Sequence, residues 1–159
     1  MRNIWAPWRF KYITQQEKEE GCLFCRVSKK NEDEKNLIIA RKEHCFLMLN
    51  LYPYNNGHLM ISPYVHVATL DALPKEQLIE LFDTVSNACA NIRTEMKPDG
   101  FNIGLNIGSV AGAGVAEHLH VHVVPRWAGD TNFMPVIGNV KVISEALEDT
   151  YKKLKKYEY

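Results

Sequence analysis

Residues 118–124 read HLHVHVV, and this alternation of histidine with apolar residues constrains the fold more than any other feature of the chain. Successive side chains of a β-strand point to opposite faces, so residues two apart share a face at intervals of about 6.5–7 Å. We therefore predict a strand whose three histidines line one accessible face while the apolar residues between them pack into a core. Pro125 cannot donate a ladder hydrogen bond and is expected to end this strand. Arg126 follows at once, where it is well placed to bind an anion.

Three interpretations of the alternating histidines remain open. The first is a polar strand face of chance composition, although three histidines within five residues are improbable. The second is a three-histidine metal site, but groups in a row on a flat strand converge poorly on one ion. The third is a nucleophile at the middle histidine, because one imidazole nitrogen can attack while a hydrogen bond holds the other. The preceding loop, residues 108–114 (GSVAGAG), offers unshielded backbone N–H groups that suit phosphoryl oxygens.

Apolar periodicity along the rest of the chain predicts a single α+β domain spanning residues 1–159, with no repeat or linker. A mostly antiparallel sheet is expected, with one long helix packed on it and a second helix at the C-terminus. Apolar runs indicate strands, and spacing of three or four residues indicates helices. The predicted strands are 37–41, 45–50, 58–62, 101–107 and 118–124, and the predicted helices are 74–96 and about 140–157.

Composition and charge restrict the partners and the location. Nineteen basic and nineteen acidic residues cancel, so no global field recruits nucleic acid or an anionic membrane, and any phosphate recognition must be local. The N-terminal stretch MRNIWAPWRFKYI lacks the apolar core and cleavage site of a signal peptide. No run of about 18 apolar residues exists to span a bilayer. A cytoplasmic protein without nucleic-acid or membrane partners is therefore expected.

The four cysteines divide into two kinds. Cys45 and Cys89 each lie alone within an apolar run, and we expect them to be buried as small hydrophobic side chains. Cys22 and Cys25 form the sequence CLFC, whose spacing suits either a metal knuckle or a redox pair. A redox pair of the thioredoxin type opens a helix after a strand, and the charged stretch QQEKEEG before CLFC is not typical of a strand. Metal binding is the favoured interpretation, and two buried thiols are the alternative.

With these features stated, the chain resembles a known family. His118-Leu119-His120-Val121-His122-Val123-Val124 is similar to the histidine-triad motif, His-φ-His-φ-His-φ-φ with φ apolar, of the HIT superfamily of nucleotide hydrolases and transferases. The stretch PYNNGHLMISPYVH (53–66) resembles the Pro-x-x-x-Gly-His strand of that family and the histidine after it. The resemblance covers residues 20–135, with an N-terminal arm at 1–20, and it implies the HIT-like α+β fold.

The resemblance implies catalytic roles for the triad. In this family the middle histidine, here His120, attacks the α-phosphorus of a nucleotide, and water or phosphate resolves the covalent intermediate. His122 corresponds to the histidine that contacts phosphate, and His118 opens the triad. Backbone donors would stabilise the developing charge without a catalytic magnesium. The implied substrate-binding residues are Asn50, His58 and Asn106, then Ser109, Gly112, Ala113 and Gly114 of the loop, and finally Arg126 and Trp127. For His58, the alternative is a structural histidine held by hydrogen bonds. For Trp127, the alternative is ordinary packing.

Zinc-bearing members of the family join a Cys-x-x-Cys pair to two histidines. Carried over to this chain, the implied ligands are Cys22, Cys25, His66 and His118. Two thiolates and two imidazoles close a tetrahedron, which is typical of structural rather than catalytic zinc. No organic cofactor is implied.

Two flanking stretches, IWAPWRFKYI and RWAGDTNFMPVIG, resemble a microbial branch described as diadenosine tetraphosphate phosphorylase (ATP adenylyltransferase) or hydrolase. We therefore expect cleavage of dinucleoside polyphosphates at the α-phosphate, by phosphorolysis or hydrolysis. The segment Ala113-Gly114-Val115 lacks the Ser, Thr or Gln that several relatives carry there, which leaves the preferred leaving group open. A nucleoside phosphoramidate hydrolase and a non-catalytic, zinc-stabilised nucleotide-binding module are the alternatives. The family usually dimerises, so a homodimer or larger homo-oligomer is expected, with Trp5 and Trp8 in packing or at its interface.

Overall fold

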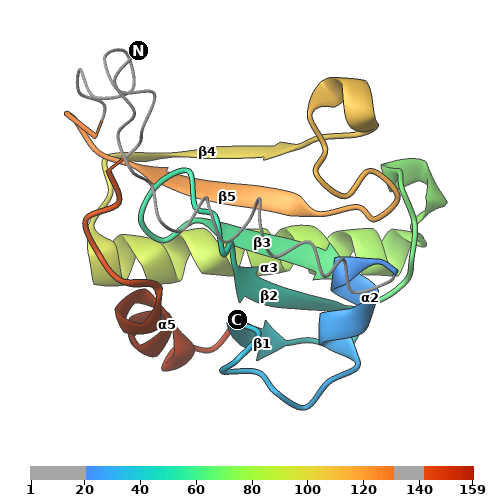
Figure 1. The fold of residues 1–159 in the computed structure, drawn as a ribbon, viewed down its shortest axis with the longest axis horizontal. Helices are drawn as coiled ribbons and strands as arrows, with labels where there is room; N and C mark the ends of the chain where they lie inside the picture. The colour runs from blue at the N-terminus through green and yellow to red at the C-terminus, as the bar shows by residue number, and fades with distance from the viewer. Residues whose placement is uncertain (1–20, 131–141) are drawn as a thin grey trace, which may run out of the picture.

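A computed structural model describes residues 21–130 and 142–159. Its centre is a five-stranded antiparallel sheet with the order β1-β2-β3-β5-β4 (Figure 1). This arrangement confirms the predicted α+β class and places β5, the strand that carries His122, inside the sheet. The strands are β1 (Ile38–Arg41), β2 (Cys45–Leu49), β3 (Leu59–Pro63), β4 (Gly100–Leu105) and β5 (Val121–Arg126).

The long helix lies where apolar spacing predicted it. Pro74 caps its start, and it ends where Lys97 adopts a left-handed conformation with φ of 50°. Two further α-helices and two short 3-10 helices belong to the described part of the chain. These elements are α2 (Leu23–Ser28), η1 (Leu70–Ala72), α3 (Lys75–Met96), η2 (Ser109–Ala111) and α5 (Leu147–Lys155).

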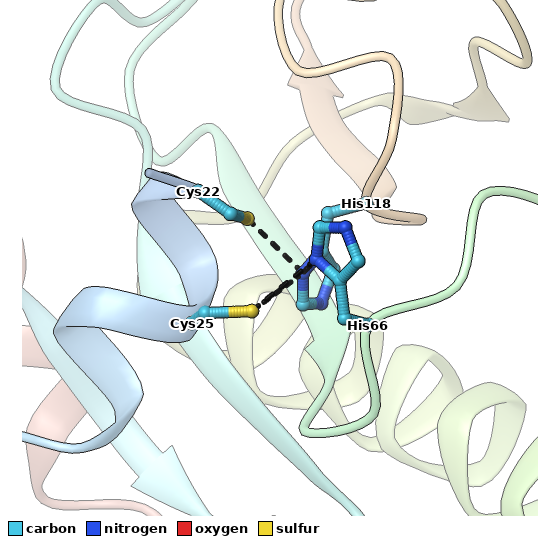
Figure 2. A group of neighbouring side chains, drawn as sticks. All are labelled: Cys22, Cys25, His66 and His118. Carbon is cyan, nitrogen blue, oxygen red and sulfur yellow. Dashed lines mark hydrogen bonds between the residues drawn. The ribbon is translucent and has the colours of Figure 1, made fainter. Parts of the chain in front are cut away.

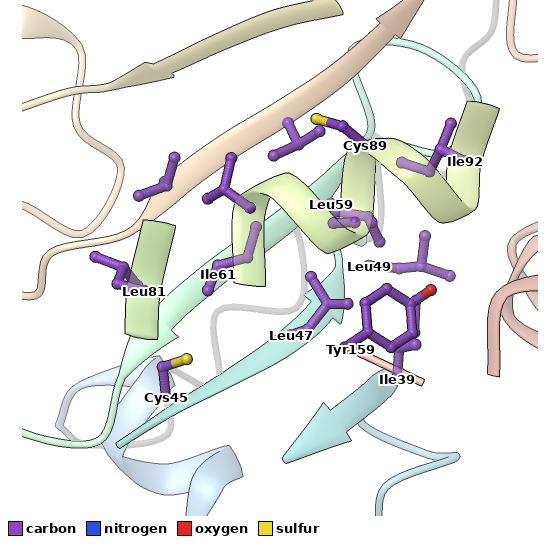
Figure 3. Close-up of a cluster of buried hydrophobic side chains, with 14 of the residues drawn as sticks. Ile39, Cys45, Leu47, Leu49, Leu59, Ile61, Leu81, Cys89, Ile92 and Tyr159 are labelled. Atoms are coloured by element: carbon purple, nitrogen blue, oxygen red, sulfur yellow. The ribbon is translucent and has the colours of Figure 1, made fainter. Parts of the chain in front are cut away.

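The sheet buries a different apolar cluster on each face. On β2, Leu47 and Leu49 belong to the cluster beneath α3 and α5, whereas Phe46 and Met48 belong to the cluster beneath α2. The first cluster, shown in Figure 3, also takes in Cys45, Cys89 and alternate residues of β3. Both cysteines are buried there, as predicted. We call this side the helix face.

The opposite side of the sheet carries α2 and the histidines, and we call it the histidine face. Met60 of β3 belongs to the cluster beneath α2 and pairs directly with His122 of β5. Val121 and Val123 belong to the opposite cluster, together with Leu119. The alternation along this segment therefore separates imidazoles from core residues as predicted. The predicted accessibility of the histidine face is wrong for two of the three, because His118 and His120 are only 1% and 5% exposed.

The predicted bounds of the histidine strand, 118–124, are wrong at both ends. β5 begins only at Val121, because the register would place Leu119 opposite Pro63, which has no N–H to donate. The Ser62 hydroxyl donates to the Leu119 carbonyl instead, at 3.1 Å. At the other end the strand continues through Pro125 to Arg126. Pro125 is tolerated because the edge of β5 that would need its missing N–H lies beyond the start of β3, so no ladder hydrogen bond is lost there. The Pro125 carbonyl on that edge accepts a hydrogen bond from the Asn55 side chain at 3.0 Å.

The C-terminal helix is shorter than the predicted range of about 140–157. Residues 142–146 are not helical, and α5 begins at Leu147. Glu148 and Asp149 in its first turn favour this start, because acidic side chains stabilise the positive end of a helix dipole. The expected N-terminal arm at 1–20 and most of the second flanking stretch, 131–138, lie outside the described residues.

One glycine near the histidines is required by its backbone. Gly57 has a φ of 72°, and a Cβ there would lie 2.8 Å from the Met96 sulfur. This left-handed turn leads directly into His58 and β3, so it sets where that histidine enters the histidine face. Among the described residues, no helix is long and apolar enough to cross a membrane.

Candidate active site and metal site

His120 is held by its backbone and by two neighbouring rings. Its Nδ1 lies 2.9 Å from the His118 carbonyl oxygen, which can only accept, so Nδ1 carries the proton and Nε2 has the free lone pair. The Phe24 ring lies 4.7 Å away on one side, and the His122 ring meets it nearly edge-on at 4.8 Å. Only 5% of His120 is exposed. The imidazole therefore has a defined tautomer and a defined orientation.

A second hydrogen-bonded chain assigns the tautomer of His122. The Tyr54 backbone N–H donates to His58 Nδ1 at 3.0 Å, so the proton of His58 resides on Nε2. His58 Nε2 then donates to His122 Nδ1 at 2.9 Å. His122 must carry its own proton on Nε2, which makes that nitrogen a hydrogen-bond donor. The sequence prediction had placed His58 near the nucleoside without detecting this contact.

Burial keeps these histidines neutral. Burial, together with the repulsion that neighbouring imidazoles would exert on a positive ring, lowers the pKa of His58 to about 3 and that of His122 to about 4. Burial also lowers the pKa of His120 below its ordinary value. A neutral imidazole retains the lone pair that a nucleophile needs.

The four predicted metal ligands meet at one point (Figure 2). Cys22 and Cys25 approach from α2, His66 from the segment after β3, and His118 from the segment before β5. Their ligand atoms all lie within 4.8 Å of one another. The sulfurs of Cys22 and Cys25 are 3.2 and 3.4 Å from His118 Nδ1, and the two imidazole Nδ1 atoms are 3.2 Å apart.

These residues fit a tetrahedral metal ion. Zinc bound to sulfur at about 2.3 Å and to nitrogen at about 2.0–2.1 Å gives ligand–ligand edges of roughly 3.3–3.8 Å, close to the spacings found here. His118 Nε2 lies 2.9 Å from the Pro63 carbonyl oxygen, so His118 Nδ1 has its lone pair free to coordinate. Burial raises the pKa of the Cys25 thiol, and the neighbouring Cys22 raises it further. A bound cation would therefore be needed to hold the Cys25 sulfur as a thiolate.

The small-residue loop before β5 contains a 3-10 turn, η2, between two glycines in positive-φ conformations. Asn106 follows β4 and donates its side-chain amide to the Gly112 carbonyl at 3.3 Å. This residue, predicted to contact phosphate or ribose, therefore braces the predicted phosphate loop. The remaining loop residues of the prediction, Ser109, Ala113 and Gly114, lie in the same segment, with Ser109 exposed.

Asn50, which the sequence predicts at the nucleoside, lies beside His58. Its Oδ1 accepts from the Tyr52 backbone N–H at 2.9 Å, and its Nδ2 lies 3.4 Å from His58 Nδ1. The exposed Tyr54 ring covers His58 at 4.6 Å and lies 5.8 Å from His122. Tyr54 had no signal in the sequence apart from its place in a turn-rich loop.

Arg126 and Trp127 are already engaged. The Arg126 guanidinium donates to both carboxylate oxygens of Asp130, at 2.6 and 2.9 Å, and to Asn102 at 2.7 Å. An anion at this position would compete with those acceptors. Trp127 donates its indole N–H to the Met96 carbonyl at 3.3 Å and lines a cavity of about 650 Å³ near the end of α3. The contacts of both residues are with this end of the fold rather than with the triad.

An antiparallel sheet with alternating histidines beside a Cys-x-x-Cys helix defines a histidine-triad protein. A family model described as HIT domain matches residues 30–129, and the chain therefore belongs to the HIT family. A protein of Mycobacterium tuberculosis named AP-4-A phosphorylase is 40% identical over 162 residues, which cover 97% of this chain and 83% of that protein.

Solved structures share the fold. A zinc-bound histidine triad family protein from Mycobacterium smegmatis superposes with a TM-score of 0.68 at 25% identity, over 85% of this chain and 91% of that one. A hypothetical histidine triad nucleotide-binding protein from Sulfolobus tokodaii gives a TM-score of 0.66 at 29% identity, over 85% of this chain and 87% of that one. These similarities confirm the HIT-like fold predicted from the histidine motif.

Proposed function

We propose that this protein is a nucleotide-processing enzyme that cleaves dinucleoside polyphosphates, such as diadenosine tetraphosphate, at the α-phosphate. The name of the M. tuberculosis relative supports this substrate class, because that similarity extends along 97% of the chain. The observation that carries the proposal is the hydrogen bond from His120 Nδ1 to the His118 carbonyl. It leaves His120 Nε2 unprotonated on a ring that cannot easily turn.

The proposed reaction has two steps at one phosphorus atom. His120 Nε2 attacks the α-phosphorus, an N–P bond forms, and the bridging P–O bond breaks with its electron pair going to the departing nucleotide. Phosphate or water then attacks the adenylyl-histidine and releases Nε2. The Nε2–H of His122 and the backbone N–H groups of the loop 108–114 are the proposed donors to the developing negative charge, apart from those of Ala111 and Gly112, which donate within the loop. Donors of this kind typically contribute about 3–4 kcal/mol each.

We also propose that Cys22, Cys25, His66 and His118 bind a structural zinc ion. Their spacing and donor types fit tetrahedral coordination, and the solved M. smegmatis neighbour is zinc-bound. Four protein ligands leave no open position, so bound zinc would stabilise the fold and supply no chemistry to the substrate. It would join α2 to the segment that carries the triad.

The other predictions from the sequence extend this proposal. We propose one HIT domain over residues 1–159, a homodimer or larger homo-oligomer, a cytoplasmic location and no organic cofactor. The triad, Asn50, His58, Asn106 and the loop residues keep their proposed roles at the nucleotide. Size-exclusion chromatography with light scattering at micromolar protein would test the dimer.

The deciding experiment measures products from diadenosine tetraphosphate with and without inorganic phosphate. Phosphate-dependent ADP formation means phosphorolysis, and AMP formed in its absence means hydrolysis. Mass spectrometry of acid-sensitive adducts after a single turnover should show adenylylation of the wild-type protein. His120→Ala should show no adduct and at least about a thousandfold lower kcat/KM, with unchanged circular dichroism.

The alternatives are distinguished in the same assays. A preference for adenosine phosphoramidate over the dinucleotide would replace the proposed substrate by that of a phosphoramidate hydrolase. Tight AMP binding without turnover of either substrate would indicate a non-catalytic binding module. Unchanged turnover in His120→Ala would overturn the mechanism itself.

A further inference from the structure

Phe24 joins the candidate metal site to the candidate nucleophile. It is the third residue of CLFC, so the two metal-ligand cysteines flank it within one turn of α2. Its ring lies 5.2 Å from the His118 ring and 4.7 Å from the His120 ring, and only 1% of the residue is exposed. We propose that Phe24 is a positioning residue that holds the His120 imidazole in its reactive orientation and makes that orientation depend on the cysteine knuckle. This inference rests on the proposed role of His120.

The contacts of His120 show why a ring is needed at Phe24. One hydrogen bond, from Nδ1 to the His118 carbonyl, fixes the tautomer but still allows the imidazole to swing about that bond. Phe24 covers one face of the imidazole at an interplanar angle of 35°, and His122 blocks it at 78°. Because both of these rings pack against the imidazole, its rotation is restricted and the lone pair of Nε2 keeps one direction. A reacting atom displaced by about 1 Å can lower a rate by about a hundredfold.

The position of Phe24 depends in turn on the knuckle. Helix α2 has six residues, too few to be stable as an isolated helix. What holds it in place is the approach of Cys22 and Cys25 to His118, together with the apolar cluster of the histidine face. The two cysteines therefore anchor the turn that presents Phe24. The proposed ligand His118 also supplies the backbone carbonyl that binds His120 Nδ1. The cysteine knuckle is therefore connected to His120 in two ways, through the Phe24 ring and through the His118 backbone.

Phe46, a neighbour of Phe24 on the histidine face, provides a matched control. Phe46 is fully buried, belongs to the same cluster as Phe24 and lies 6.3 Å from it. Its other ring contact is with Tyr64, at 5.5 Å. Phe24→Leu and Phe46→Leu remove the same atoms from the same cluster. The two variants differ in that only the Phe24 ring contacts His120.

The test compares steady-state kinetics of full-length wild type, Phe24→Leu and Phe46→Leu on diadenosine tetraphosphate. Phe24→Leu should lower kcat by about ten- to a hundredfold with KM within about threefold, because it disorders the nucleophile rather than the binding site. Phe46→Leu should keep kcat within about threefold at a similar loss in urea-unfolding midpoint. Phe24→Met, whose flexible side chain fills irregular gaps but has no flat ring, serves if the leucine variant does not fold, and it should also lower kcat.

A second readout does not depend on activity. Long-range ¹H–¹⁵N spectra of the histidine rings should show a single His120 Nδ1–H tautomer in wild type and Phe46→Leu. Phe24→Leu, and wild type treated with a chelator, should show averaged or doubled His120 signals. Equal kcat losses in both leucine variants, or a rise in KM alone for Phe24→Leu, would overturn the inference. The second outcome would mean that Phe24 lines the nucleoside pocket. Inactive wild-type protein would instead overturn the proposed function.

Discussion

The two faces of the sheet are built from alternate residues of the same strands, yet they are organised differently. The helix face buries a largely aliphatic cluster that includes Leu47, Ile61 and Ile92, each without exposed surface. The histidine face carries rings held by specific polar contacts, such as His58 with His122 at 2.9 Å. Apolar packing tolerates changes that conserve volume. A buried polar network does not, because each unpaired member is costly.

This difference assigns separate tasks to the two faces. Val121 and Val123 anchor β5 from the helix face, while His122 between them faces the candidate site. The cluster of the histidine face is smaller, with six buried residues in the part of the chain that the structure describes. The four-residue cysteine–histidine site lies on this side, where cross-linking can replace some of the missing apolar burial. Substitutions on the helix face should therefore change stability, and substitutions on the histidine face should change chemistry or metal binding.

The largest effect expected from this comparison is loss of the metal ligand Cys25. Cys25→Ser should abolish stoichiometric zinc, measured by atomic absorption. It should lower the free energy of unfolding by at least about 4 kcal/mol, a fraction of the roughly 10–16 kcal/mol that zinc binding contributes to zinc-finger folding. Urea titration of protein purified without chelator measures that loss.

Cys89→Ala is the control on the helix face. Its thiol is buried in the aliphatic cluster, and the substitution should cost about 1 kcal/mol with zinc content unchanged. If the two cysteine variants lost equal stability and kept equal zinc, the histidine face would not depend on a metal.

Regular patterns predicted most of the fold. Period-two alternation located the histidines and their core neighbours, and spacing of three or four residues located α3 within one residue. The errors came from features without periodicity. Whether Pro63 or Pro125 interrupts a strand depends on which neighbouring strand lies beside it, and that is a property of the register. Helix α2 is too short for a periodic signal, and α5 begins late because its acidic first turn favours that start.

The candidate site was predictable where residue type alone indicates chemistry. The sequence pointed to the two cysteines and two histidines that the structure brings within 4.8 Å. It did not indicate that His58 contacts His122, because 64 residues separate them. Phe24 was not singled out at all, since a buried aromatic residue is most simply explained by packing. Contacts made by ordinary core residues thus required the three-dimensional arrangement.

Acid should destabilise the histidine face selectively. The folded-state pKa values of His58 and His122, about 3 and about 4, lie below their ordinary value near 6.5. Between those limits the unfolded chain binds more protons, so stability is fully present above about pH 6.5 and falls as pH decreases toward 4. Urea unfolding should show about 4 kcal/mol less stability at pH 5 than at pH 7.5, about 2 kcal/mol from each imidazole.

His58→Asn separates this effect from acid release of a metal. The asparagine carboxamide can still accept from the Tyr54 N–H, which His58 Nδ1 accepts in the wild type, and it does not titrate. Metal release affects both proteins equally, so the variant should lose only about half as much stability between pH 7.5 and pH 5. An undiminished pH dependence would show that the buried pair does not cause the acid sensitivity.

The smallest expected effect comes from removing one methyl group from a buried isoleucine on each face. Ile92 on the helix face and Ile38 in the cluster of Phe24 are both fully buried. Each Ile→Val change should cost about 1 kcal/mol, as deletion of a buried methylene group typically does. Ile92→Val should leave kcat unchanged, whereas Ile38→Val should lower it about two- to threefold, because a looser cluster lets Phe24 move against His120. Matched unfolding and kinetic measurements on the two variants decide it. Equal kcat values at equal stability would mean that packing on the histidine face does not affect the orientation of His120. The functional difference between the two faces would then depend only on the hydrogen bonds of the histidine face.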